Sequence, residues 1–312
     1  MLSPSLQEQV RQLKTRFKIG SAELKVSDKA SSNKGFFQGQ PAFVKILTDD
    51  DPKWVNRFVA EVNIYRHLQN SPHSQIFEIM PKMLDSNIEI APFYLVMEWK
   101  DAAVNYSPMR WAEKEVGIDI AVKMGEILSK LHTTLRTVTS DLGLKTIIPG
   151  ELHQKMADYL NEMPDSYLGD KFKRAIVSKL PPWLDIFSNS PKQIIHGDPL
   201  FTNFMSASDR LYLIDYEYAV ISHPAHDLAS FWVTSSLAPK SRLLALNRYR
   251  SLYSSWTADF ERVLQLFKAR YALRELSQLH QSRGYHITFT EEGKQQIIAD
   301  QFVTLQSVLE LG

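Results

Sequence analysis

Hydrophobic positions in the first third of the chain alternate between short runs typical of strands and one helical stripe. The runs 42–47 (AFVKIL) and 93–99 (FYLVMEW) are rich in β-branched and aromatic residues, which is typical of buried strands. Between them, the apolar residues of 54–69 recur every three or four positions and predict a helix that ends before Pro72. A shorter helix is predicted over 6–17. This part of the chain therefore predicts a small sheet with one or two helices.

After Trp99 the pattern becomes mainly helical. Apolar spacings of three and four predict helices over residues 120–135, 241–253, 258–279 and 294–311. Two strands are predicted at 193–195 and 211–216, and Pro181, Pro182 and Pro191 are expected to break the chain before the first of them. The sequence predicts an α+β protein with a small β-rich N-terminal lobe, residues 1–99, and a larger, mainly helical C-terminal lobe, residues 100–312. We expect a ligand in a cleft between them.

Composition narrows the possible functions. The 312 residues carry a net charge of +1, so the chain has no strong field for nucleic acid or an anionic membrane. Because there is no cysteine, disulfides, thiolate catalysis and zinc–cysteine sites are excluded. No apolar run approaches the ~18 residues of a membrane span, and residues 1–20 lack the apolar core of a signal peptide. We therefore expect a cytoplasmic protein with no membrane span and no nucleic-acid partner.

Three side chains follow one another at spacings typical of phosphoryl transfer. Asp198 lies in the turn 196–198 (HGD), Asn203 follows five residues later, and Asp215 comes after the apolar run 211–214. One carboxylate would accept the proton of a hydroxyl, while an amide and a second carboxylate would bind Mg²⁺ through hard oxygen atoms. An aspartate in an ordinary turn, or one that caps a helix, is the alternative for each carboxylate. The joint spacing favours Asp198 as catalytic base and Asn203 with Asp215 as magnesium ligands.

A lysine in the middle of a predicted strand is the candidate for phosphate binding. Lys45 lies between Val44 and Ile46, where an unpaired buried ammonium would be costly. Glu61 follows sixteen residues later on the predicted helix, and a pair of this kind holds nucleotide phosphates in kinases. The alternative is an edge-strand lysine that faces water. The segment 30–37, just before this strand, is expected to form a loop that covers phosphates with backbone amides and small polar side chains.

Histidines near the end of the motif invite a second interpretation. His223 and His226 followed by Asp227 suggest a zinc site, but Pro224 argues against one regular helix that presents all three. Asp227 is instead expected to cap the next helix and to brace the catalytic turn by hydrogen bonds. His132 is expected to be an interior histidine with its hydrogen bonds satisfied.

The distance between two aspartates bears on the size of the acceptor. Only twelve positions separate Asp215 from Asp227, which is too short for the activation segment with which protein kinases dock peptides. The acceptor is therefore expected to be a small molecule.

Together these residues resemble the aminoglycoside phosphotransferase and choline kinase superfamily of protein-kinase-like small-molecule kinases. The resemblance implies a kinase-like fold with ATP and Mg²⁺ between the lobes and an alcohol as acceptor. It implies that Lys45 binds phosphates and pairs with Glu61, and that Ser31 and Asn33 belong to the nucleotide loop. Met97, Glu98 and Trp99 would form the hinge under adenine. The matching segments are SSNK (31–34), VKI (44–46), Glu61, LVMEW (95–99), LH (131–132), HGDPLFTN (196–203), LIDYEYA (213–219) and HDLA (226–229).

The acceptor is the least determined part of the prediction. Within the superfamily, 215–219 (DYEYA) is most similar to choline, ethanolamine and thiamine kinases, which implies an amine-bearing acceptor. Glu217 would point to the side of Asp215 if the strand continued, and Trp232 or Trp256 would add cation–π contacts. Either tryptophan is otherwise a core residue. An aminoglycoside antibiotic kinase, which needs an acidic acceptor surface, and a non-catalytic pseudokinase are the competing hypotheses.

Overall fold

The computed structural model describes residues 4–20, 23–26, 29–70, 78–101, 117–136, 142–164, 168–207, 210–234, 237–281 and 291–310. The chain divides into two compact units, and their secondary structure confirms the predicted α+β class. The first unit comprises Met1–Val104, Thr139–Leu144 and Met205–Ala219, and the second comprises Asn105–Val138, Lys145–Phe204 and Val220–Gly312. The segment 205–219, which carries Asp215, thus packs with the β-rich unit, although a division at residue 99 assigns it to the helical lobe.

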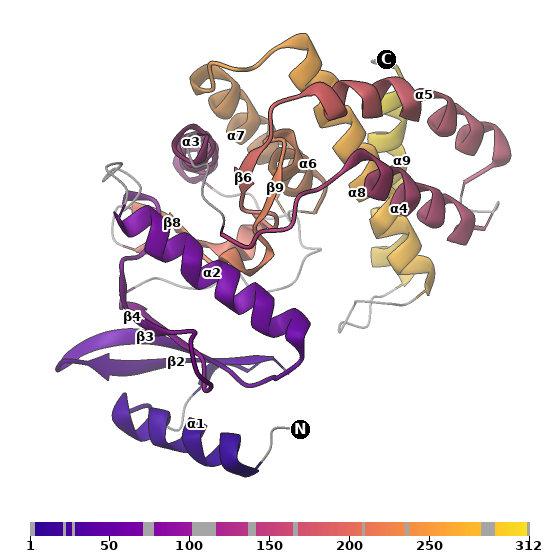
Figure 1. Ribbon diagram of the computed structural model, residues 1–312. Helices are drawn as coiled ribbons and strands as arrows, with labels where there is room; N and C mark the ends of the chain where they lie inside the picture. The colour runs from indigo at the N-terminus through magenta and orange to yellow at the C-terminus, as the bar shows by residue number, and fades with distance from the viewer. Residues whose placement is uncertain are drawn as a thin grey trace. The chain divides into compact units, whose positions relative to one another are not determined.

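The first unit is built on a five-stranded antiparallel sheet in the order β1-β2-β3-β5-β4. Its two helices lie on opposite faces of the sheet (Figure 1). The strands are β1 (Glu23–Val26), β2 (Ala30–Phe37), β3 (Gln40–Leu47), β4 (Met83–Asn87) and β5 (Tyr94–Glu98), and the helices are α1 (Pro4–Arg16) and α2 (Pro52–Asn70).

Alternation along β3 assigns each face of this sheet to one helix. Val44 and Ile46 join Val96 of β5 in a buried cluster with Val10 and Leu13 of α1. Successive side chains of a strand point to opposite faces, so Lys45 points away from this cluster and towards α2. The isolated lysine in an apolar strand therefore faces a helix and not water.

The segment 30–37, expected to be a loop, is strand β2. It pairs with β3 along its whole length, from Ala30 opposite Leu47 to Phe37 opposite Gln40. Gln38 and Gly39 connect the two strands with φ angles of 49° and 81°. A two-residue hairpin turn with positive φ at both positions matches the twist of the strands, so this turn stabilises the hairpin. The polar sequence of β2 concealed its alternation of buried and exposed side chains.

A second hairpin belongs largely to the first unit and carries Asp215. It consists of β7 (Phe204–Ala207) and β8 (Arg210–Leu213), and the 3₁₀ helix η3 (Tyr216–Tyr218) follows. The strand predicted over 211–216 therefore ends at Leu213, whose N–H donates to the carbonyl of Ile79 at 2.7 Å.

The second unit is a helical assembly around α8. This helix is buried along most of its length and packs against α4, α5, α6 and α9, while α3 packs against α7 (Figure 1). Strands β6 (Gln193–Ile195) and β9 (Val220–Ser222) form a small antiparallel sheet. The helices are α3 (Ile118–Leu135), α4 (Pro149–Glu162), α5 (Asp170–Asn189), α6 (Ala225–Thr234), α7 (Pro239–Leu252), α8 (Ala258–Gln281) and α9 (Glu291–Glu310).

Two prolines expected to interrupt the chain lie inside a helix. Pro181 and Pro182 are within α5, whose apolar stripe continues on both sides of them through Leu180 and Trp183. A proline in a helix interior costs about 3 kcal/mol. Burial of the continuous stripe offsets this cost, so tertiary packing overrides the local signal.

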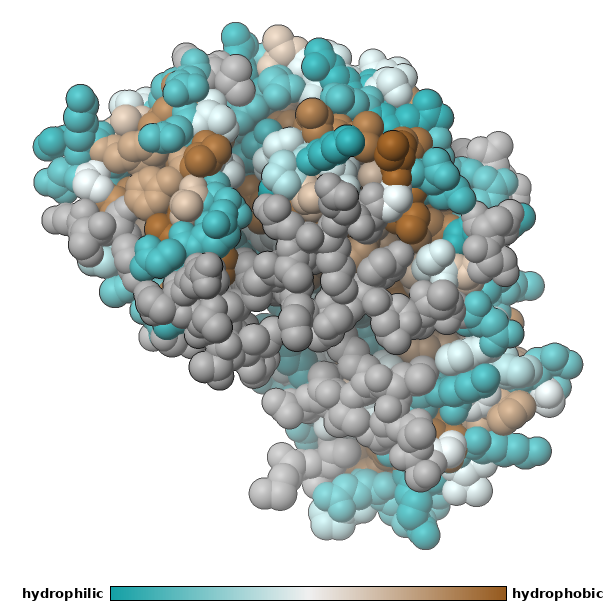
Figure 2. Space-filling view, turned by 180° about the vertical axis from the view of Figure 1, so that it is seen from behind, coloured by the Kyte–Doolittle hydropathy of each residue, from teal (hydrophilic) through white to brown (hydrophobic). Residues whose placement is uncertain are grey.

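Figure 2 shows one face, on which hydrophilic side chains surround patches of hydrophobic ones. No helix in the described ranges is long and apolar enough to cross a membrane. Large exposed apolar side chains are spread over several elements: Phe36, Ile90, Ile118, Ile148, Val177, Leu243, Leu252 and Val303.

The close packing of α3 on α7 depends on one glycine. A Cβ added at Gly125 would lie 2.1 Å from the backbone oxygen of Ala245, whereas one at Gly150 of α4 would meet nothing within 4 Å. We expect Gly125→Ala to lower the free energy of unfolding by about 1–3 kcal/mol, because the helices must separate. Gly150→Ala is the control and should be neutral or stabilising. Equal denaturant midpoints for the two variants would contradict this account of the packing.

Candidate active site

The predicted catalytic turn lies in the second unit, at the end of β6. After Ile195 the chain turns through Gly197, whose φ of 81° is a conformation that favours glycine. Asp198 follows, and the short 3₁₀ helix η2 (Phe201–Asn203) begins three residues later. The Asn203 side-chain nitrogen donates to the backbone oxygen of Asp198 at 2.8 Å. This bond orients the amide, so its oxygen, the atom that binds cations, is directed away from the Asp198 carbonyl.

A buried aspartate holds the turn in place. Asp227 accepts hydrogen bonds from the backbone N–H groups of His196 at 2.8 Å and Gly197 at 2.7 Å. Its Oδ2 also lies 2.9 Å from Nε2 of His132, whose Nδ1 lies 2.9 Å from the Tyr249 hydroxyl. Burial would raise the pKa of Asp227, but the hydrogen bond and charge of His132 outweigh it and lower the pKa. The structure thus confirms both the predicted bracing and the interior role of His132.

One detail of the Asp227 prediction is wrong. Helix α6 begins at Ala225, so Asp227 lies in its first turn and does not precede the helix as a cap. The two carboxylate oxygens therefore serve the turn of β6 and the imidazole of His132.

Four charged side chains converge inside the first unit. Lys45 Nζ lies 2.8 Å from Glu61 Oε2, 2.8 Å from Asp215 Oδ1 and 3.4 Å from Glu217 Oε2. The side chains of Lys45 and Glu61 are only 9% and 1% exposed, whereas those of Asp215 and Glu217 are 23% exposed. The predicted Lys45–Glu61 pair is therefore present and buried. The two further carboxylates that contact Lys45 are partly accessible to solvent.

Local backbone geometry explains how two acidic side chains reach the same lysine. Asp215 has φ 70° and ψ 62°, a left-handed conformation that ends the β8 segment and starts η3. The ring of Tyr216 then packs edge-on against Tyr65 of α2, with 5.6 Å between centroids. Glu217 therefore lies beside Asp215, as predicted, but a 3₁₀ turn places it there because the strand does not continue.

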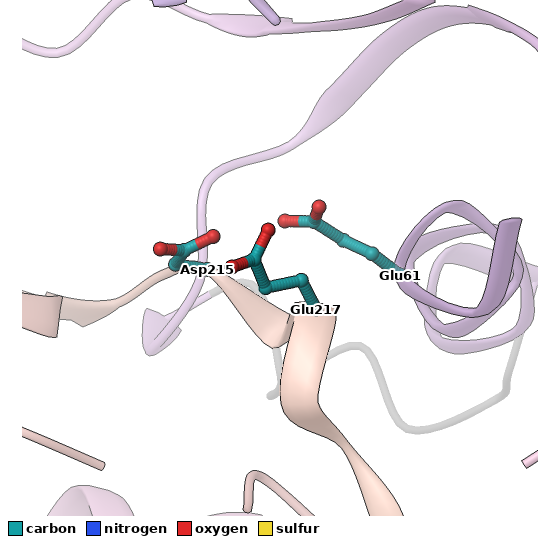
Figure 3. A group of neighbouring side chains, drawn as sticks. All are labelled: Glu61, Asp215 and Glu217. Atoms are coloured by element: carbon teal, nitrogen blue, oxygen red, sulfur yellow. The ribbon is translucent and has the colours of Figure 1, made fainter. Parts of the chain in front are cut away.

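The three carboxylates form a candidate metal centre. One oxygen each from Glu61, Asp215 and Glu217 lies within 4.8 Å of the others, and Figure 3 shows the carboxylates turned towards one another. This is the only such acidic or histidine group among the residues that the structure describes. Hard oxygen donors of this kind suit Mg²⁺. Glu217, predicted to contact the acceptor, thus lies with Lys45 and Asp215, the residues predicted to bind phosphate and the metal.

Crowding of like charges changes the acidity of the group. Burial raises the pKa of Glu61, and the negative charges of Asp215 and Glu217 raise it further. Lys45 offsets these effects only in part, so the pKa is about 7. Burial would lower the pKa of Lys45, but the three carboxylates outweigh it and raise that pKa well above its usual value. The ammonium is therefore charged, while Glu61 titrates near neutrality.

The sheet register corrects the prediction for the nucleotide loop. Ser32 lies directly opposite Lys45, whereas Ser31 and Asn33 lie opposite the two neighbours of Lys45 on β3. Directly opposite residues share a face, so Ser31 and Asn33 point to the α1 side. They are 4% and 0% exposed, and the Asn33 amide donates to the Ser31 hydroxyl at 3.0 Å. The geometry thus favours Ser32 as the polar side chain on the Lys45 face.

The predicted hinge residues lie at the end of β5. Met97 is two positions from Leu95, the partner of Lys45, and so shares the Lys45 face of the sheet. Glu98 accepts from the backbone N–H of residue 82 at 2.9 Å, and Trp99 donates to Asp101 at 2.8 Å. Their role under adenine remains a prediction.

The aromatic residues proposed for a cationic acceptor already have protein partners. Trp232 of α6 has Lys268 Nζ 4.6 Å and the Arg242 guanidinium 5.6 Å from its ring centroid. Trp256 stacks on Phe260 at 4.6 Å. The structure therefore gives no support to either ring as a binding site for an amine.

The histidines near the end of the motif do not form a zinc site. His226 stacks on Phe267 at 4.4 Å, and its Nε2 lies 3.0 Å from Arg270 Nη1 and 2.9 Å from the Tyr271 hydroxyl. Sequence analysis did not single out these α8 residues, because an arginine on a helix usually lies on a solvated face.

A strand lysine paired with a helix glutamate and an aspartate-bearing turn are features typical of kinase-like phosphotransferases. A model of the Phosphotransferase enzyme family matches residues 25–266, and the chain belongs to this family. The chain is therefore a phosphotransferase enzyme.

Solved structures share the fold at low sequence identity. The choline kinase LicA of Streptococcus pneumoniae has a TM-score of 0.59 and 17% identity over 98% of this chain and 100% of that chain. A choline/ethanolamine kinase family protein of Mesorhizobium loti gives 0.62 and 16% over 98% and 100%. The macrolide 2'-phosphotransferase MphH of Brachybacterium faecium gives 0.60 and 13% over 94% and 97%. No curated protein matches the chain.

The raised pKa of Glu61 predicts a pH dependence of stability. Between its ordinary pKa of 4.5 and about 7, the folded state holds a proton that the unfolded state releases. The stabilisation from this proton is complete below 4.5 and is lost as the pH rises through about 7. Denaturant unfolding of Glu61→Gln should lack this decline, whereas the exposed control Glu89→Gln should keep it. Parallel profiles for wild type and Glu61→Gln would refute the assignment.

The brace at Asp227 predicts a large effect of a small change. In Asp227→Asn an NH₂ group replaces one acceptor oxygen and faces an N–H donor, so at least one buried donor loses its partner. We expect a loss of about 1–3 kcal/mol for each unsatisfied group. The control is Asp259→Asn, which alters an exposed pair with Arg262 and should change stability by less than about 0.5 kcal/mol. Thermal unfolding of both variants measures the difference, and equal losses would argue against the brace.

Proposed function

We propose that this enzyme is an ATP- and Mg²⁺-dependent kinase of small molecules that transfers the γ-phosphoryl group to an acceptor hydroxyl. The observation that carries the proposal is the buried lysine surrounded by three carboxylates in the first unit. Family membership supplies the reaction class, and several solved structures with this fold are named as complexes with ATP or AMP-PNP. A cytoplasmic location, where ATP is available, is part of the proposal.

Different residues position the substrates and neutralise the charge of the phosphates. Lys45 keeps its ion pair with Glu61 and binds phosphate oxygens in place of the carboxylates of Asp215 and Glu217. Asp215 would hold Mg²⁺, with Glu217 as an additional candidate ligand, and Asn203 is the further ligand that the sequence predicts. A bound Mg²⁺ would supply positive charge to the phosphates. Such catalysis consists mainly of positioning and electrostatic stabilisation.

Asp198 supplies the proton-accepting group. In this mechanism its carboxylate accepts a hydrogen bond from the acceptor hydroxyl, orients the oxygen towards the phosphorus and takes the proton late in the transfer. The fixed turn keeps the carboxylate in place because both preceding backbone N–H groups are bound by Asp227.

The pseudokinase hypothesis is disfavoured by the intact set of charged residues. Lys45, Glu61 and Asp215 are in contact, and Asp198 is present on a braced turn. The amine-bearing acceptor rests on the resemblance of 215–219 to choline and ethanolamine kinases, since Glu217 and Trp232 have other partners. Macrolide and aminoglycoside phosphotransferases share the fold, so the fold does not select the acceptor.

The proposal predicts different losses for the two aspartates. Asp198→Asn should lower kcat by about 10²–10⁴-fold, because general base catalysis contributes this much, and should keep Mg²⁺-dependent nucleotide binding. Asp215→Asn should lose the Mg²⁺ dependence of that binding, whereas the exposed Asp50→Asn is the control. The measurement is ADP release, with and without Mg²⁺, on choline, ethanolamine, thiamine, sugars, homoserine and aminoglycosides. Undiminished turnover of Asp198→Asn would remove its assigned role.

A further inference from the structure

A cavity of the second unit lies at the first residue of β6, whereas the catalytic turn follows the last residue of this strand. The cavity has a volume of about 590 Å³ and is lined by the end of α5, the start of β6, the residues after β9 and the start of α8. All of its lining residues belong to the second unit, and they include Gln193, His223 and Phe260. Ligand-binding pockets have volumes of roughly 300–1,000 Å³, so this cavity is large enough for a small molecule.

His223 offers this cavity a hydrogen-bond donor. The residue is only 5% exposed and lines the cavity. Its Nδ1 accepts from the backbone N–H of Ala225 at 3.2 Å, so the proton of the neutral ring is on Nε2. Burial lowers the pKa of His223, the charges of His132 and Lys192 lower it further, and the pKa is about 3. The ring is therefore neutral, and its Nε2 has no hydrogen-bond partner among the residues that the structure describes.

Gln193 offers the same cavity an acceptor. This residue is 7% exposed, and its side-chain nitrogen donates to the backbone oxygen of His132 at 2.6 Å. Its side-chain oxygen Oε1 has no hydrogen-bond partner within the described part of the chain. Gln193 lies opposite Ser222, the residue before His223, and Cα atoms of opposite residues are about 4.5–5.5 Å apart. The acceptor and the donor therefore come from neighbouring positions of one small sheet.

The charges around the cavity favour neither an anion nor a cation. The charged side chains in its lining are Arg136, Lys192, Asp185 and Asp259. Two positive and two negative charges cancel, and His223 adds none. Lys192 already donates to two backbone oxygens at the end of α5, and Asp259 is paired with Arg262 at 3.0 Å. An ion would therefore lose its hydration here without a net electrostatic attraction in return.

Aromatic rings form one wall of the cavity. The ring centroid of Phe260 lies 4.8 Å from that of His223 and 5.6 Å from that of Tyr253. Phe260 and Tyr253 both line the cavity and are themselves buried. Aromatic faces and edges pack well against another flat ring. The polar pair thus lies beside a surface that suits a planar apolar group.

We propose that this cavity binds an uncharged molecule that carries an amide, a carboxamide or a lactam, next to a flat apolar group. The amide oxygen accepts a hydrogen bond from His223 Nε2, the amide N–H donates to Gln193 Oε1, and the apolar group packs on Phe260. An amide has an acceptor and a donor on adjacent atoms, whereas a carboxylate only accepts and an ammonium only donates. The site is separate from the catalytic turn, and the inference does not depend on the proposed kinase function.

Four probes with one carbon skeleton test this specificity. Benzamide, benzoate, benzamidinium and acetophenone differ only in charge and in hydrogen-bonding groups, and calorimetry or ligand-observed NMR measures their affinities for the full chain. We expect saturable binding of benzamide, at least about fivefold tighter than that of the other three, because each of them leaves a buried polar group unpaired or buries a charge. A parallel titration with 2-pyridone distinguishes a lactam from a carboxamide. If solvent alone fills the cavity, no probe binds, and this result or equal affinities would overturn the inference.

Variants of the two polar residues connect this preference to the cavity. Gln193→Met removes the acceptor, so the preference for benzamide over acetophenone should disappear. His223→Phe keeps a ring beside Phe260 and removes the donor, so both probes should bind about 2–10-fold more weakly, as expected for one neutral hydrogen bond. The matched controls are Gln154→Met and His153→Phe, the same substitutions at exposed positions of α4, which should change neither affinity. An unchanged preference in Gln193→Met would contradict the proposal, and this ratio does not depend on the stability of the variant.

Competition with nucleotide separates this site from the proposed catalytic one. Saturating MgATP should leave the affinity for benzamide unchanged, because the cavity lies at the other end of β6. Displacement of benzamide by MgATP would assign the probe to the nucleotide site and overturn the inference. No step of the test uses kinase activity, so a failure of the proposed function would leave its result unaffected.

Discussion

The burial of one ammonium group among three carboxylates determines how the first unit is organised. Lys45 is held by Glu61, Asp215 and Glu217, which come from a helix and from a hairpin distant in sequence. An unpaired buried lysine would be costly, so α2 and the segment 205–219 must both pack on the sheet to satisfy it. One charge therefore connects the strand, the helix and the returning hairpin. The same requirement leaves an excess of negative charge, which is the property a magnesium nucleotide site needs.

The second unit also buries a charged group, and here the charge is negative. Asp227 is a fully buried carboxylate that accepts hydrogen bonds from two backbone N–H groups and is hydrogen-bonded to the His132 ring nitrogen. Its charge shapes the turn that carries Asp198. Burying a charge costs free energy in both units, and in each unit the buried group fixes the backbone or side chain beside it. Asp198, Asp215 and Glu217, to which we assign the chemistry, are partly exposed.

Sequence analysis identified the chemistry better than the path of the backbone. Lys45 and Glu61 could be paired from their residue types, because a lysine in an apolar strand requires an acidic partner. The hairpin of β2 could not be recognised, since polar residues conceal its alternation and the face of Ser31 and Asn33 depends on register. Likewise, Glu217 was placed beside Asp215 for the wrong reason, because a left-handed residue and a 3₁₀ turn leave no clear trace in the pattern. Packing along α5 likewise overrides the signal of Pro181 and Pro182.

Acceptor specificity is the feature for which sequence alone was least informative. Tryptophans and a glutamate suggested a cationic substrate, yet each has a protein partner: cations lie over Trp232, and Glu217 contacts Lys45. No motif of the sequence identifies the alcohol, because the contacts that bind a small molecule come from side chains far apart in sequence. The fold does not select it either, since choline kinases and macrolide phosphotransferases share this fold.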